Sequence, residues 1–176
     1  GIAPIAKNAS YREFFVLEDA DPNETILGRA YKSDEAVTVR HGIQFDMKNG
    51  KRSATQRFVN HYLKKDGTAY TEAELATMEY YDQFQNRDPR LAQTLQSPTY
   101  VQIGATSHES LDWERTVNGY RIIKYISDAS HEGATTSTSD FALFRYAEVL
   151  LNYAEAKAEL GTLTDADVAA TIDVIR

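Results

Sequence analysis

The chain has 176 residues and a net charge of −7 at neutral pH, and 42% of its residues are hydrophobic. This composition is typical of a globular domain, and the acidic balance argues against nucleic-acid binding, which requires clustered Lys and Arg. The sequence contains no cysteine, which excludes disulfides and Cys-based zinc sites. It also contains no apolar run of the roughly 18 residues that a membrane span requires.

The first third of the chain is predicted to consist of short elements joined by turns. Ser10–Phe15 has the character of a helix end. Asp19–Asn23 is expected to turn, because Pro fixes φ and the Asp and Asn side chains bond their own backbone. Apolar residues alternate from Glu35 to Met47, which favours an extended, half-buried strand. Ala54–Leu63 is predicted to be a short helix that Asp66-Gly67 ends.

The middle of the chain combines one capped helix with long loops. Thr71–Glu74 has the capping-box pattern and predicts a helix that continues to about Asn86, close to a proline. Ser97–Glu114 is polar and is expected to be a long loop. Asn118-Gly119 predicts a turn into a strand over the Tyr-rich segment that follows. Asp128–Ser139 is rich in Ser, Thr and Gly and is predicted to be another loop.

The strongest helical pattern begins at Asp140. Gly161 is expected to end this helix, and Thr164 to cap a second one. Small residues on the apolar face allow close approach, so we predict an antiparallel helical hairpin with Leu151 and Ala154 buried in its seam. The unit resembles a tetratricopeptide hairpin, although the chain shows no internal repeat. The apolar face consists of Ala147, Leu150, Leu151, Ala154 and Ala158.

Few residues suggest chemistry. The four histidines are scattered without metal-ligand spacing, and motifs for a nucleophile elbow or a phosphate loop are absent, so no cofactor or metal is expected. Carboxylates are abundant, and a glycoside hydrolase fragment with paired acids therefore stays as an alternative. The cluster Arg87–Arg90 either binds an anion or, the favoured interpretation, holds Asp88 in local hydrogen bonds.

The best candidates for binding a sugar are Trp113 and Tyr100, which bracket a polar loop. A sugar binder gains by stacking C–H faces on an aromatic ring and by hydrogen bonds at the ring edge. The alternative for Trp113 is that its ring plugs the loop onto the core. The polar residues between the two aromatics are Gln102, Ser107, His108, Glu109, Ser110 and Asp112.

Two longer motifs resemble those of the SusD/RagB family of glycan-binding outer-membrane lipoproteins. The first is Arg145–Ala156, followed by Glu159-Leu160-Gly161, and the second is Asn86–Leu91. Weaker similarity extends over Thr55–Tyr62 and Gly119–Tyr125. The chain opens on Gly1 and closes without a helix stop signal, so it is expected to be the middle part of a longer protein.

The resemblance implies a mainly α fold, in which tetratricopeptide-like hairpins support an irregular part with a few short strands. Residues 1–139 would be the loop-rich ligand-binding part, and residues 140–176 one hairpin. Such proteins capture oligosaccharides at the cell surface and pass them to a TonB-dependent (SusC-like) transporter, without catalysis or cofactor. They are held at the outer membrane by a lipid anchor that this chain lacks. Family glycan contacts vary, so no site residue carries over. A protein-binding scaffold is a further alternative.

Overall fold

The computed structural model describes residues 10–34 and 38–175 of the chain. Contacts divide the chain into two compact units. The first joins the N-terminal residues up to Val39 with the C-terminal residues from Thr138, and the second is the continuous segment Arg40–Ser137. The sequence predicted a ligand-binding part over residues 1–139 and a helical hairpin over residues 140–176. The two contact-based units do not test which residues bind a ligand, so that assignment stays a prediction.

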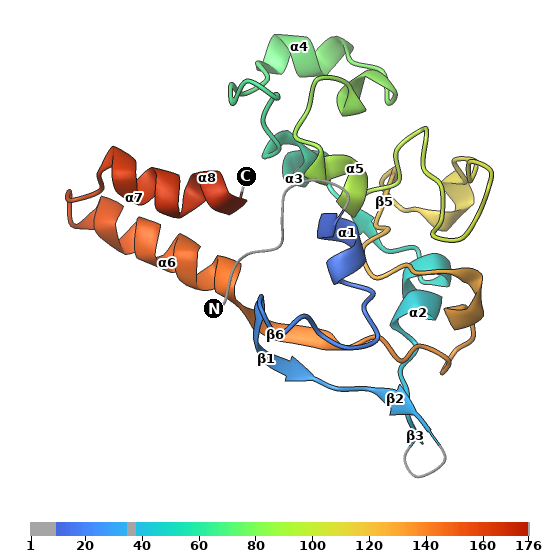
Figure 1. The fold of residues 1–176 in the computed structure, drawn as a ribbon. Coiled ribbons are helices and arrows are strands. Elements are labelled where there is room, and N and C mark those ends of the chain that lie inside the picture. The colour runs from blue at the N-terminus through green and yellow to red at the C-terminus, as the bar shows by residue number, and fades with distance from the viewer. Residues whose placement is uncertain (1–9, 35–37, 176) are drawn as a thin grey trace. The chain divides into compact units, whose positions relative to one another are not determined.

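Antiparallel strand pairs form the base of the first unit (Figure 1). β1 pairs with β6, with Thr25 opposite Arg145 and a bulge in the register, and β2 pairs with β3. The strands are β1 (Thr25–Arg29), β2 (Lys32–Ser33), β3 (Thr38–Val39) and β6 (Phe141–Arg145).

The segment before β1 follows the sequence prediction. Helix α1 (Ser10–Phe14) ends at the aromatic pair, and the predicted turn is closed by Asp21, whose Oδ1 accepts a hydrogen bond from the Asn23 backbone N–H at 2.8 Å. The Asp140 carboxylate accepts from the backbone N–H groups of Ala20 and Tyr31, at 3.0 and 2.7 Å. These bonds hold the start of β6 in extended form, so the helix predicted from Asp140 begins only after that strand.

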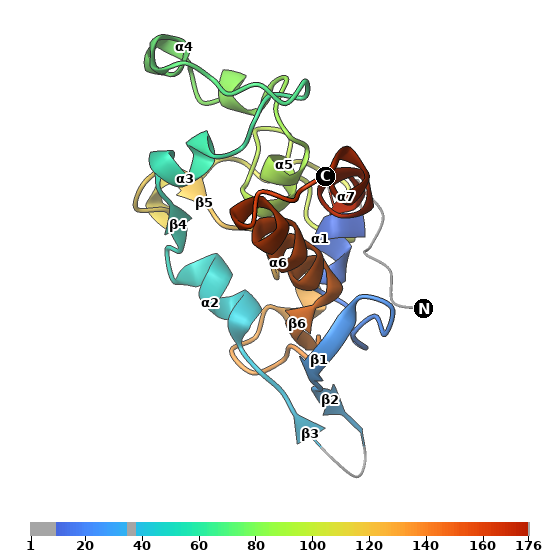
Figure 2. The same cartoon turned by 90° about the vertical axis from the view of Figure 1, so that its left-hand side faces the viewer.

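The C-terminal hairpin consists of α6 (Tyr146–Glu159) followed by α7 (Asp165–Ala170) and α8 (Ile172–Ile175), which lie beside α6 in Figures 1 and 2. Both predicted caps are confirmed. Gly161 has φ +65° and its N–H donates to the Ala158 carbonyl, as in a Schellman motif. Thr164 and Asp167 form a reciprocal capping box. None of the helices in the described ranges is both long and apolar enough to cross a bilayer.

The buried face of α6 is narrower than predicted. Ala154 is 4% exposed, as expected, and Ala147 is also buried. Leu151 is 48% exposed, so the prediction that it lies in the seam is wrong. The buried side chains of α6 are those of the two alanines, whereas the apolar periodicity of the sequence marks a wider face.

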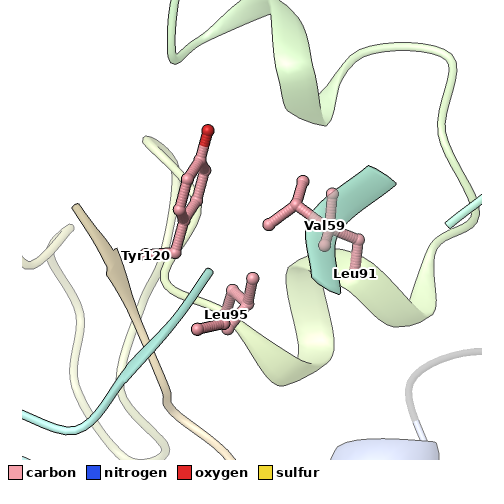
Figure 3. Packing of buried hydrophobic residues seen from close by; sticks show 5 residues of the cluster. Val59, Leu91, Leu95 and Tyr120 are labelled. Atoms are coloured by element: carbon pink, nitrogen blue, oxygen red, sulfur yellow. The ribbon is translucent and has the colours of Figure 1, made fainter. Parts of the chain in front are cut away.

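The second unit contains short helices, single 3₁₀ turns and one strand pair. β4 and β5 pair with Ala54 opposite Tyr120, and Tyr120 joins Val59, Leu91 and Leu95 in a buried cluster (Figure 3). The elements are α2 (Ile43–Asn49), β4 (Ser53–Ala54), α3 (Gln56–Asn60), α4 (Glu72–Thr77), η1 (Asp82–Phe84), α5 (Arg90–Thr94), η2 (Trp113–Arg115), β5 (Tyr120–Arg121) and η3 (Ala129–His131).

The strand predicted from alternation is present only in part: Thr38-Val39 forms β3 and His41 pairs with Ser137, whereas α2 replaces the stretch from Ile43. Residues 35–37 of that stretch lie outside the described residues, and the helix begins at Ile43. Its buried side chains are Gln44 and Lys48, one helical turn apart. Gln44 Oε1 accepts from the Ser127 backbone N–H at 2.9 Å. Because the buried side chains of this helix are polar, the apolar residues beside them show the two-residue period of a strand and hide the 3.6-residue period of the helix.

The capped helix in the middle of the chain is shorter than predicted. Thr71 and Glu74 form the expected capping box, but α4 ends at Thr77 and only the 3₁₀ turn η1 follows. Tyr80 is drawn into the core, where its hydroxyl donates to the Gln96 carbonyl and its ring stacks on Tyr120 at 5.7 Å. This tertiary packing outweighs the local preference to continue the helix.

The predicted loops are largely confirmed. Ser97–Glu114 is irregular until η2 begins, and Asp128–Ser139 contains one 3₁₀ turn. The glycine of Asn118-Gly119 has φ +85° and leads into β5, which is shorter than the strand predicted there. Helix α3 begins after Thr55, whose hydroxyl accepts from the Phe58 backbone N–H at 3.2 Å.

Candidate functional site

An open pocket of about 620 Å³ lies within the second unit. The start of α3, the segment around η1, the turn η2 and the turn into β5 each contribute side chains to it. Three lining residues are aromatic and four carry uncharged polar groups. The lining consists of Tyr80, Trp113, Tyr120, Thr55, Gln56, Gln83, Asn118 and Gly119.

Trp113 presents the largest exposed aromatic surface of this pocket. Its indole is 58% exposed and meets the Tyr80 ring edge-on, with centroids 5.5 Å apart and planes at 78°. A Cβ added to Gly119 would lie 3.0 Å from an indole carbon, so the ring rests against that backbone. Asp112 caps the turn through Oδ1, which accepts from the Glu114 backbone N–H at 2.9 Å, and pairs with Arg115 at 3.0 Å. The indole thus packs against Tyr80 and the Gly119 backbone, and the rest of its surface is open to solvent.

A hydrogen-bonded ladder of amides forms the polar side of the pocket. The Tyr120 hydroxyl lies 2.6 Å from Gln83 Oε1 and also contacts Gln56 Oε1. Gln56 Nε2 donates to Gln83 Oε1 at 3.1 Å and to Asn60 Oδ1 at 2.8 Å. Figure 3 shows the Tyr120 hydroxyl pointing away from Leu95, so the ring packs in the core while its polar end reaches the amides.

The pocket carries no formal charge on its lining residues. Burial raises the pKa of the Tyr120 hydroxyl, and burial together with the neighbouring Tyr120 raises the pKa of the Tyr80 hydroxyl. Both phenols are therefore neutral at physiological pH. The site offers an aromatic face with amide and hydroxyl groups at its border.

Tyr100, the second candidate from the sequence, lies elsewhere. It is 4% exposed and packs with Ile123, Ile126 and Met47. Its ring supports the second unit from within and does not line the pocket around Trp113. We therefore base the site on Trp113, and a glycan contact at either residue stays a prediction.

The polar loop residues expected to accompany Trp113 line a separate pocket of about 480 Å³. Its charged groups are paired. Lys48 Nζ lies 2.5 Å from Glu132 Oε1, and the Glu109 carboxylate accepts from buried Arg121 at 2.6 Å. The loop members of this lining are Gln102, Ala105, Ser107, His108, Glu109, Ser110, Asp112 and Arg115.

The Arg87–Arg90 cluster is structural, as the sequence favoured. Asp88 Oδ1 accepts from the backbone N–H and the Nε of Arg90, both at 2.9 Å. Arg87 is buried, donates to the Val59 carbonyl at 3.2 Å and lies over the Tyr70 ring at 4.3 Å. Across the described residues, no group of three His, Cys, Asp or Glu side chains is arranged to hold a metal ion.

Three comparisons relate this chain to known proteins. Residues 24–176 match the model of the SusD family (SusD_RagB). None of the curated proteins is similar enough to match.

Two solved structures from Bacteroides fragilis have a similar fold. One is described as a SusD-like carbohydrate binding protein, at 22% identity and a TM-score of 0.54 over 88% of this chain and 33% of that one. The other is described as a SusD-like protein, at 20% identity and a TM-score of 0.64 over 92% of this chain and 38% of that one. The chain thus spans little more than a third of these structures.

Proposed function

Because this chain belongs to the SusD family, we propose that it captures oligosaccharides without altering them. The observation that carries the proposal is the exposed indole of Trp113 at the border of an uncharged, amide-lined pocket. A pyranose ring has apolar C–H faces and a rim of hydroxyls. The face gains by stacking on an aromatic ring, and the hydroxyls require neutral donors and acceptors at the edge.

Binding without catalysis fits this lining better than hydrolysis. A glycoside hydrolase needs two carboxyl groups that flank the scissile bond. The residues around Trp113 supply amides, hydroxyls and rings instead. The carboxylates of Glu109 and Asp112 belong to the other pocket, where each is paired with an arginine.

The wider role we propose follows from the family. The protein would act at the cell surface of the outer membrane, held there by a lipid anchor, and would deliver oligosaccharides to a partner TonB-dependent transporter. In this proposal the hairpin of α6, α7 and α8 is a tetratricopeptide-like unit that supports the binding part. The similarity of one solved structure described as carbohydrate binding supports the ligand class.

The test is isothermal calorimetry with a panel of oligosaccharides, combined with product analysis of the same samples. We expect binding without release of new reducing ends. Trp113→Ala should weaken binding about tenfold while lowering the free energy of unfolding by no more than about 1 kcal/mol, because over half of the ring is already exposed.

Tyr81→Ala is the matched control, since Tyr81 is an exposed aromatic that does not line the pocket. It should bind like the parent. Hydrolysis that disappears on mutation of one Asp or Glu would contradict the proposal. A large loss of stability in Trp113→Ala would show instead that the ring is a core plug.

A further inference from the structure

Gln83 combines burial with an unused donor. Its side chain is buried, with the residue 6% exposed, and its Oε1 accepts from the Tyr120 hydroxyl and from Gln56 Nε2. Within the described part of the chain its Nε2 has no hydrogen-bond partner, although the residue lines the pocket. Nε2 is not among the fully buried polar atoms that lack a partner, so this donor reaches the open side of the pocket, where a ligand or water can meet it.

The orientation of this amide is assigned from its hydrogen bonds with the neighbouring amides. Exchanging the nitrogen and oxygen of Gln83 would set its NH₂ group against the NH₂ of Gln56, which already donates to Asn60 at 2.8 Å. With the observed orientation, Gln83 Oε1 accepts from Gln56 Nε2 and faces the Tyr120 hydroxyl, whose single proton is shared with Gln56 Oε1. The two N–H donors of Gln83 are then the groups left for a ligand.

The charge of the surroundings limits what that ligand can be. A carboxylate or sulfate that enters the pocket loses water and meets no cationic lining group to replace it. Two arginines stand outside this lining. Arg115 lines the other pocket and pairs with Asp112. Arg87 is buried under Tyr70, donates to the Val59 carbonyl and has two further nitrogens buried without a partner, so its charge is held inside the unit and not on the pocket wall.

We infer that this pocket selects uncharged sugar units and that Gln83 Nε2 donates to a hydroxyl or ring oxygen of the unit stacked on Trp113. The inference rests on the proposed function and goes further, because it names uncharged glycans as the ligand class and Gln83 as a residue that contacts them. Acidic glycans of the uronate or sulfate type are the class it excludes from this site.

The experiment compares one oligosaccharide with its own acidic form. Maltohexaose, cellohexaose and mannohexaose are titrated into the full chain by calorimetry, and the tightest binder is then oxidised at C6 to the corresponding uronic acid chain. We expect the oxidised form to bind at least tenfold more weakly, because the one group that has changed is C6, from a neutral hydroxymethyl to a carboxylate that the uncharged lining does not pair.

Gln83→Glu tests the donor, since it replaces NH₂ by oxygen at nearly constant shape and keeps the acceptor for Tyr120. It should weaken binding of the neutral sugar about tenfold or more. The matched control is Gln85→Glu, which makes the same change at an exposed position two residues further on. This control should bind within twofold of the parent.

The outcomes separate the inference from the proposed function. Equal or tighter binding of the oxidised sugar, lost in Trp113→Ala, would overturn the selectivity and leave glycan capture in place. A folded Gln83→Glu variant that binds normally would overturn the role of Gln83. Failure of every neutral and oxidised sugar to bind would overturn the inference together with the proposed function.

Discussion

Gly119→Ala tests how Trp113 is positioned. Gly119 has φ +85°, a conformation that costs an L-residue about 1–2 kcal/mol. The new Cβ would also lie 3.0 Å from the indole, closer than an ordinary carbon contact of about 3.5–4.0 Å. The ring must therefore shift by about 0.5–1 Å away from its support. We expect a loss of about 1–2 kcal/mol in stability and about fivefold weaker oligosaccharide binding.

The control is Gly161→Ala, because Gly161 has φ +65° and a Cβ there would meet nothing within 4 Å. It should lose a similar stability through the backbone alone and bind normally. Trp113 is the only tryptophan, so its fluorescence reports the ring directly. The emission maximum should move in Gly119→Ala and not in Gly161→Ala. Identical spectra and equal binding in the two variants would refute the support that Gly119 gives the indole.

Two further predictions concern stability. Ala154→Glu should destabilise the C-terminal hairpin by at least about 3 kcal/mol, because it buries an unpaired charge. Leu151→Ser should change the stability little, because Leu151 is exposed. Equal losses of stability for the two variants in circular dichroism melts would contradict this prediction. Lys64 and the Thr71 N–H lower the pKa of Glu74 from 4.5 to about 2, so its stabilising effect is present above pH 4.5 and is lost as the pH falls towards 2. Denaturant titrations of Glu74→Gln should show a weaker pH dependence between these values than the parent shows.

The features that could be predicted from the sequence are those that neighbouring residues determine. The capping boxes at Thr71 and Thr164 and the glycine end of α6 need only residues a few positions apart, and all are present. The strand predicted before Met47 holds at β3 and is wrong from Ile43, where α2 buries Gln44 against Ser127, far along the chain. Periodicity records which residues are apolar, and it has no signal for a buried polar stripe.

The site divides in the same way. Trp113 could be singled out because a lone large aromatic in a polar loop is unusual, and the structure places it at a pocket. Gln56 and Gln83 could not, because the Tyr120 hydroxyl brings them together from distant segments. Tyr100 shares the polar loop in sequence, but its ring turns into the core. The polarity of the loop therefore indicated the segment that contains the site, but it could not predict that Trp113 faces the pocket and Tyr100 faces the core.

The central claim is that a neutral sugar binds at Trp113, and a crystal structure of the full chain with its tightest-binding hexasaccharide tests it most directly. The account predicts a pyranose ring stacked on the indole, with Gln83 Nε2 within about 3.2 Å of a sugar oxygen. A sugar bound in the pocket of Lys48 and Arg115, with Trp113 left free, would contradict it.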